Sequence, residues 1–328
     1  MKEKMGSKDI IDMKKRSISS SFLGQLKTGN LKSITDYVRV DPYLDLELRG
    51  DSVMIYYRGG KVLTVDEKGL LTGLADEYYL SPDTERIQPT IEGLHDYLAH
   101  AKHIVDIHEA NPEYSKLGEK EIQQRVVYEN NLSVNADNTD YFIADVEWAD
   151  NKVLKGRADI VAFRWNHMEH RKRVIQLTLI EVKQGEDAIR TNGKNSPGLK
   201  KHYDDYLSFK EDQEYVDCLA KDMLLVLKQK KELGLVKGLD NLFEKKITET
   251  DASGNIVERR VEMDLQIEAE PDFLFLLANY HHYSTNLQIE CEDKDWIDDC
   301  KFINASFCGY GLYKDMIKTK KELKFSSI

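Results

Sequence analysis

Three strand-like runs follow one another closely near the middle of this 328-residue chain, and they constrain its fold more than any other feature. Residues 141–148, 157–165 and 174–183 are rich in apolar and β-branched residues, and short polar turns separate them. Such runs predict neighbouring antiparallel strands. A helical spacing of apolar residues at 118–132 precedes them, and a long helical stretch at 198–233, with an expected break near Lys210, follows them.

The remaining pattern predicts one mixed α/β domain with a small β-rich N-terminal attachment. We divide the chain into a flexible N-terminus (1–20), a β-rich segment (21–84) and an α/β domain (85–328). Around Arg58-Gly59-Gly60 the sequence predicts a hairpin within a β-meander, because glycine readily adopts positive φ. Further expected elements are a helix at 90–109, a hairpin at 246–268, a buried strand at 273–278 and a strand at 301–313.

Two acidic residues lie in or at the end of these apolar runs. Asp159 follows Ala158 in the second run, and Glu181 and Lys183 end the third. A buried carboxylate is costly unless a cation or hydrogen bonds compensate it. If the two runs pair as a hairpin, Asp159 lies opposite Glu181, and Glu181 and Lys183 share a face. A Mg²⁺ or Mn²⁺ ion would relieve the repulsion between the carboxylates, so the pattern indicates metal-assisted phosphodiester hydrolysis.

These residues resemble the PD-(D/E)xK nuclease superfamily. The match is Asp159, then 21 intervening residues, then Glu181-Val182-Lys183, followed by a helix that carries His202 and Tyr206. Ala158 stands where the family usually has proline. An acidic residue two before a lysine occurs eight times in the chain, but only Glu181 ends a long apolar run that follows a second run with its own acid.

The resemblance implies a restriction-endonuclease-like αβββαβ core with a mixed central sheet, and it implies roles for individual residues. Asp159, Glu181 and the main-chain carbonyl of Val182 would hold Mg²⁺ or Mn²⁺, and Lys183 would position the attacking water. An acid from the preceding helix would join the site, and Glu121 is favoured over Glu129 for this role. His202 and Tyr206, one helical turn apart, would support the site.

Charge distribution favours a nucleic-acid partner, although the formal net charge of −11 would repel phosphate. Residues 155–201 contain eleven Lys and Arg but only five Asp and Glu, a local charge of +6. A solvated basic face is the alternative interpretation. We expect phosphate contacts from Arg157, Lys194, Lys200 and Lys201.

Other classes of function are disfavoured. The four cysteines form no Cys-x-x-Cys pair, which favours a reducing, cytoplasmic location. No apolar stretch approaches the roughly 20 residues of a membrane span, and no phosphate-binding Gly-x4-Gly-Lys-Ser/Thr loop occurs. We therefore expect a Mg²⁺-dependent nuclease acting on DNA in phage defence, restriction or DNA processing, with a homodimer as the simplest assembly. The alternatives are an inactive nuclease-like module that binds nucleic acid or a protein, and a protein with no nucleic-acid partner.

Overall fold

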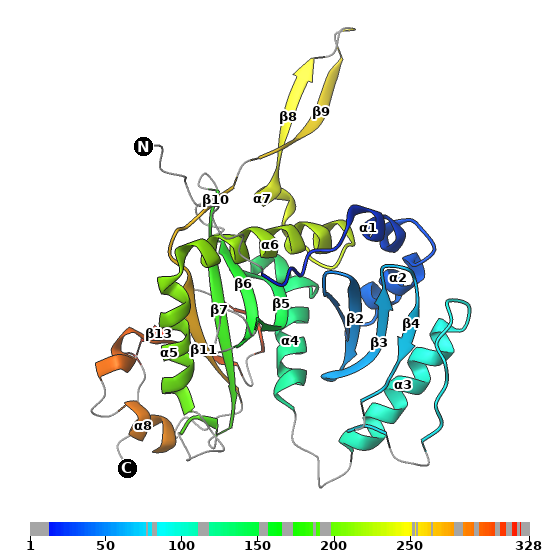
Figure 1. The fold of residues 1–328 in the computed structure, drawn as a ribbon. Helices are drawn as coiled ribbons and strands as arrows, with labels where there is room; N and C mark the ends of the chain where they lie inside the picture. Colours follow the sequence, from blue (N-terminus) through cyan, green and yellow to red (C-terminus); the bar gives the residue numbers. More distant parts are fainter. Residues whose placement is uncertain are drawn as a thin grey trace, which may run out of the picture.

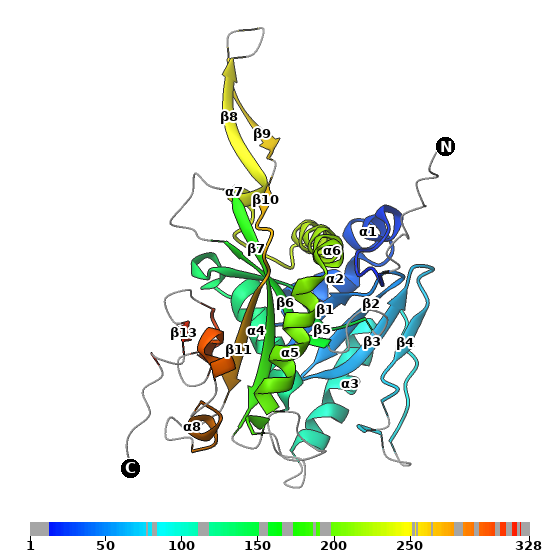
Figure 2. The ribbon, with the colours of Figure 1, turned by 60° about the vertical axis from the view of Figure 1, so that its left-hand side comes forward.

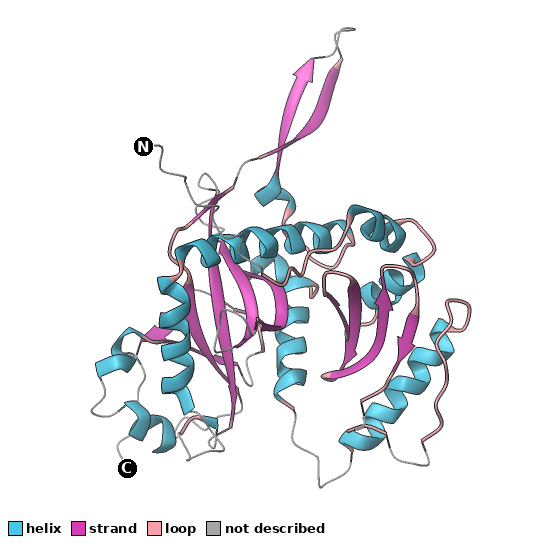
Figure 3. Ribbon diagram, in the orientation of Figure 1, coloured by secondary structure: helices cyan, strands magenta, loops and turns pink. Residues whose placement is uncertain are grey.

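A mixed β-sheet with helices on both sides forms the centre of the structure (Figures 1 and 3). This computed structural model describes residues 13–76, 78–80, 84–110, 118–150, 157–165, 173–185, 188–190, 198–250, 253, 255–263, 265–278, 285–291, 295–305, 309–312, 317–319 and 322. The α/β class predicted from the sequence is confirmed.

The order of the strands in the central sheet is β13-β12-β11-β7-β6-β5, and β10 also pairs with β7. The strands β5, β6 and β7 are antiparallel neighbours, as their short connections predicted. β11 is parallel to β7, and β12 is parallel to β11, so the sheet is mixed. The bounds are β5 (Tyr141–Ala149), β6 (Arg157–Trp165), β7 (Val174–Gln184), β10 (Gln266–Ile267), β11 (Asp272–Ala278), β12 (Lys301–Ala305) and β13 (Lys318–Thr319).

Different helices cover the two faces of this sheet (Figure 2). Since side chains alternate along a strand, Ile160 of β6 packs in the cluster that contains Ile122 of α4, and Val161 packs in the cluster built by α5 and α6. Asp212 separates α5 from α6, and its carboxylate caps α6 by accepting a hydrogen bond from the Tyr215 amide. The helix break thus falls close to the predicted one. The bounds are α4 (Glu119–Asn131), α5 (Gly198–Glu211) and α6 (Gln213–Glu232).

The N-terminal part is a four-stranded antiparallel sheet with three helices. The sequence predicts the β-meander, but α1 and α2 were not predicted. Tyr97 of α3 donates a hydrogen bond to the carbonyl of Val62, so α3 packs on this sheet, although we had placed it in the domain of residues 85–328. One hydrophobic cluster joins both parts. The bounds are α1 (Ser20–Lys27), α2 (Lys32–Val40), β1 (Leu44–Leu48), β2 (Ser52–Tyr57), β3 (Gly60–Asp66), β4 (Leu71–Gly73) and α3 (Leu94–Glu109).

Arg16 and Ile18 are buried, so the segment 13–19 is anchored to the body, in contrast to the flexible N-terminus (1–20) that the sequence predicts; residues 1–12 lie outside the described part. Arg16 is buried and forms an ion pair with Asp145 of β5 (3.0 Å). Its main-chain amide donates a hydrogen bond to Asp222 of α6 (2.7 Å). Ile18 exchanges main-chain hydrogen bonds with the side chain of Gln229. These contacts tie the N-terminus to the central sheet and α6.

A buried charge cluster lies between the N-terminal sheet and the central one. Lys230 of α6 contacts Glu47 of β1 at 2.7 Å, and both side chains are almost inaccessible to solvent. Arg49, directly after β1, pairs with Asp145, and it also donates a hydrogen bond to the carbonyl of Val146 (2.9 Å). Burial raises the pKa of Glu47 well above its ordinary value, although the Lys230 charge acts in the opposite direction. The two parts are therefore held together by charged as well as apolar contacts.

The hairpin of β8 and β9 extends away from the body (Figure 1). Nearly all its side chains are exposed. Among the residues described, no helix is long and apolar enough to cross a membrane. The described residues also form α7 (Asp240–Phe243), β8 (Glu244–Thr250), β9 (Ile256–Glu262), α8 (Thr285–Cys291) and 3-10 helices at Ala136–Asn138 and Asp295–Asp299.

Candidate active site

Asp159 and Glu181 lie next to each other on β6 and β7. The paired register of these strands ends at Ile160 opposite Ile180, and Asp159 and Glu181 are the next residue on each strand. Both side chains are buried. The Asp159 carboxylate accepts a hydrogen bond of 2.8 Å from the main-chain amide of Val182, so this side chain links the strands where their backbone pairing stops.

Lys183 and His202 both contact the Glu181 carboxylate. Lys183 Nζ lies 2.6 Å from Glu181 Oε1, and His202 Nδ1 lies 2.9 Å from the same oxygen. His202 comes from α5, and its Nε2 lies 3.2 Å from Lys183 Nζ. An ammonium group can only donate, so Nε2 accepts, and a neutral ring with its hydrogen on Nδ1 satisfies both contacts. The three side chains therefore form a closed set of hydrogen bonds.

The folded protein shifts the pKa values of the two carboxyl groups in opposite directions. Burial raises the pKa of Asp159 well above its ordinary value, and the negative charges of Glu181 and Glu119 raise it further. Burial also acts to raise the pKa of Glu181, but the hydrogen bond from His202 and the Lys183 charge outweigh burial and lower it. Two nearby acids whose pKa values are separated in this way are typical of functional sites.

The helix acid whose charge acts on Asp159 is Glu119, which the sequence analysis did not single out. Glu119 lies in the first turn of α4, and its charge is among those that raise the pKa of Asp159. A signal was present in the sequence, because Glu119 is three residues before Ile122 and seven before Val126. It therefore continues the helix face that packs on the sheet.

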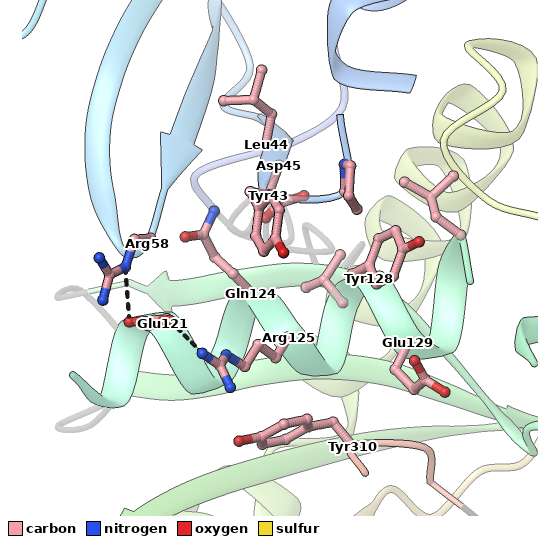
Figure 4. A pocket seen from close by; sticks show the side chains of 13 residues that line it. Tyr43, Leu44, Asp45, Arg58, Glu121, Gln124, Arg125, Tyr128, Glu129 and Tyr310 are labelled. Atoms are coloured by element: carbon pink, nitrogen blue, oxygen red, sulfur yellow. Dashed lines mark hydrogen bonds and ion pairs between the residues drawn. The ribbon is translucent and has the colours of Figure 1, made fainter. Parts of the chain in front are cut away.

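Glu121, the favoured acid, does not meet Asp159. Its carboxylate pairs with Arg125 (2.6 Å) and with Arg58 of the β2–β3 turn (3.4 Å), on the side of α4 that faces the N-terminal part (Figure 4). Glu129 lies two turns further along α4 and accepts a hydrogen bond from Asn135 (3.0 Å). The structure therefore does not bring either acid together with Asp159 and Glu181.

The other predicted residues differ in their placement. Tyr206 donates a hydrogen bond to the Pro271 carbonyl (2.8 Å), so it anchors α5 to the segment that enters β11. Lys200 and Lys201 are exposed on α5 and pair with Asp204 and Asp205, four residues on. Surface ion pairs of this kind contribute little to stability, so either lysine could exchange its aspartate partner for another anion. Arg157 belongs to β6, but its side chain, like all of Lys194, lies outside the described residues.

The donor set suits a hard divalent cation. Two carboxylates and the Val182 carbonyl would provide oxygen ligands to such an ion, and Mg²⁺ commonly keeps waters or substrate phosphates in its remaining positions. Because burial and the neighbouring negative charges raise the pKa of Asp159, an added positive charge would favour its ionised form. Among the described residues, no three His, Cys, Asp or Glu side chains form a complete metal site by themselves. Any ion here would therefore depend on main-chain, water or substrate ligands.

No protein-family model matches the chain, and no match was found among curated proteins or solved structures. Its function must therefore be argued from its own residues.

Proposed function

We propose that the protein is a Mg²⁺- or Mn²⁺-dependent nuclease that hydrolyses phosphodiester bonds of DNA. One observation carries the proposal: Asp159 and Glu181 occupy adjacent positions where β6 and β7 separate, and Lys183 lies beside Glu181 in a buried cluster. Opposed carboxylates with an adjacent amine are the groups that metal-assisted phosphoryl hydrolysis uses.

The topology supports the same proposal. The element order α4, β5, β6, β7, α5 and β11, with β11 parallel to β7, agrees with the αβββαβ core of the PD-(D/E)xK superfamily that the motif resembles. α6 follows α5 as an addition to this core. Because the acids lie at the ends of central strands, the sheet holds them rigidly.

The residues divide the chemistry among them. A bound divalent ion would lower the pKa of a water molecule and neutralise phosphate charge, and Asp159, Glu181 and the Val182 carbonyl would hold it. Lys183 would leave its contact with Glu181, orient the attacking water and donate to the phosphate oxygen that gains charge. The neutral His202 would hold the Glu181 carboxylate in place. Lys200 and Lys201 would exchange their aspartate partners for backbone phosphates, and a dimer would be the simplest way to cut both strands.

Lys183→Met tests this function, because it removes the ammonium and keeps an unbranched apolar side chain. We expect plasmid cleavage in Mg²⁺ or Mn²⁺ to fall about 10²- to 10³-fold, the size of effect seen when one charge-stabilising donor is lost. Chelator should abolish cleavage by the unmodified protein. Lys245→Met, on the exposed β8–β9 hairpin, is the matched control and should retain full activity. Equal cleavage by the two variants would reject the proposal.

An inactive module that binds nucleic acid or a protein is the second candidate. It is favoured by the closed contacts of Glu181 with Lys183 and His202, which leave one carboxylate oxygen already engaged. For this candidate, a duplex would be retarded in a gel but never cut in Mg²⁺ or Mn²⁺. DNA binding that weakens steeply with salt would separate a nucleic-acid partner from a protein one.

A further inference from the structure

A half-open pocket of about 350 Å³ lies between the N-terminal part, α4 and Tyr310 (Figure 4). Its volume is within the range of small-molecule sites, roughly 300–1,000 Å³, which often occur where parts of a protein meet. Three tyrosines from separate segments line it: Tyr43 precedes β1, Tyr128 belongs to α4, and Tyr310 lies after β12. We call it the tyrosine pocket. Aromatic walls of this kind favour a flat ligand.

Both arginines that line the tyrosine pocket are already paired with acids, and Asp45 and Glu129 line it as well. Glu121 pairs with both Arg58 and Arg125, and Arg58 also pairs with Asp106 (3.0 Å). The Arg125 guanidinium lies 5.7 Å from the centre of the Tyr310 ring. Because each arginine has an acidic partner, the pocket offers no excess positive charge to a phosphate group. Its ligand should therefore carry no negative charge.

Gln124 supplies a directed polar group in this mostly apolar site. The amide oxygen of its side chain accepts a hydrogen bond from the Gly59 main chain, which fixes the orientation of the group. Its buried Nε2 has no hydrogen-bond partner among the residues described. A buried donor without a partner is unfavourable, so a ligand acceptor that reaches Nε2 would be favoured. Gln124 lines the pocket between Arg58 and Tyr43 (Figure 4).

We propose that the tyrosine pocket binds an uncharged, planar heteroaromatic ring of nucleobase size, stacked on tyrosine and accepting a hydrogen bond from Gln124. Such a ring is carried by a free nucleoside or by a base turned out of a DNA strand. The proposal does not depend on cleavage, because neither Asp159, Glu181 nor Lys183 lines the pocket.

The test measures binding without divalent ions, so that a failure of nuclease activity cannot affect it. One arm titrates the four deoxynucleosides in saturation-transfer NMR. The other follows the fluorescence of a 2-aminopurine, placed unpaired in a duplex. A signal in the first arm identifies a free nucleoside as ligand, and a signal in the second arm alone identifies an extruded base.

Two variants connect binding to the pocket. Tyr43→Ser removes a side chain that is 66% exposed, so the fold should persist. The nucleoside or extruded base should then bind about tenfold more weakly. Gln124→Glu keeps the acceptor for Gly59 but deletes the Nε2 donor, and should also weaken binding. Leu70→Ser, at the same exposure of 66% and outside the pocket, is the control.

Three results would overturn the proposal. The first is the absence of a signal in both arms. The second is equal affinity in Tyr43→Ser and Leu70→Ser. The third is a nucleotide that binds at least tenfold more tightly than its nucleoside in the unmodified protein but not in Arg125→Gln, since the phosphate would then be the recognised group.

Discussion

The Asp159 carboxylate is bound to the main-chain amide of Val182 on the neighbouring strand, at 2.8 Å. The hydrogen bond fixes the acid of β6 beside the acid of β7, even though the two carboxylates repel each other. Backbone geometry therefore holds together two groups that electrostatics would separate, and the stability of the fold should report on the charge of Asp159.

Asp159 should make stability fall as the pH rises. The pKa of Asp159 is raised in the folded protein. Its contribution to the free energy of unfolding is therefore complete below the pKa of the unfolded chain, near 3.9, and is lost as the pH rises through the pKa of the folded protein. Asp159→Asn keeps an acceptor for Val182 without the charge. We expect this variant to melt at a higher temperature than the unmodified protein at pH 8 and at a similar temperature near pH 4. Asp217→Asn, on the exposed face of α6, is the control for circular-dichroism melts. A variant that is less stable at pH 8 would contradict the argument.

Glu119 and Glu121 should give different effects when each is changed to glutamine. Glu119→Gln removes a charge close to Asp159, so it should weaken Mn²⁺ binding, measured by calorimetry, with little loss of stability. Glu121→Gln breaks two arginine contacts and should lower the free energy of unfolding by about 1.5–3 kcal/mol, without changing the Mn²⁺ affinity. If instead Glu121→Gln weakened Mn²⁺ binding and Glu119→Gln lowered the stability, Glu121 would be the helix acid of the site.

Local sequence patterns predict much of the fold and of the candidate site. The remaining features depend on contacts between residues that lie far apart in the sequence. The pairing of Asp159 with Glu181 followed from two short-linked strands and a period of two. The resemblance favours Glu121 as the helix acid near Asp159, whereas helical spacing along the buried face of α4 points to Glu119. The packing of residues 13–19 had no local signal, because Arg16 finds its partners 129 and 206 residues away. The long-range ion pair depends on tertiary packing that no local periodicity reveals.

Gly59 should be intolerant of a side chain. It has φ +83°, and a Cβ built on it would lie 2.6 Å from Lys120 Cβ at the start of α4. Gly69 has nearly the same φ, +84°, but its nearest neighbour would be 3.9 Å away. Gly69→Ala should therefore cost only the backbone penalty, about 1–2 kcal/mol. Gly59→Ala should cost about 1–3 kcal/mol more by overpacking, as measured by urea unfolding.

Cleavage rates of the two alanine variants would test the link to the active site. A displaced start of α4 moves Glu119, so Gly59→Ala should also lose activity, whereas Gly69→Ala should not. Equal stability and equal activity of the two variants would show that the Gly59 contact is unimportant.

The buried pair Lys230–Glu47 should matter far more than a surface pair of similar length. Lys230→Met removes the nearer cation of Glu47 and leaves only the longer contact with Arg49 (3.7 Å), and we expect unfolding to become easier by about 3–5 kcal/mol. Adding Glu47→Gln should recover part of that loss. Lys27→Met breaks a 2.8 Å pair with Glu232 in which both side chains are 47% exposed, and should cost less than about 1 kcal/mol. Urea unfolding at pH 7 measures all three, and similar costs for Lys27 and Lys230 would refute the prediction.

The β8–β9 hairpin gives the molecule a reach beyond its own body. Six steps from Glu244 to Thr250, at about 3.4 Å each, carry the strand roughly 20 Å outward. A macromolecule approaching from that side would therefore contact the β8–β9 hairpin before it contacted the central sheet or its helices. The encounter distance on that side is then set by β8 and β9, and shortening these strands would reduce this distance while leaving β6 and β7 unchanged.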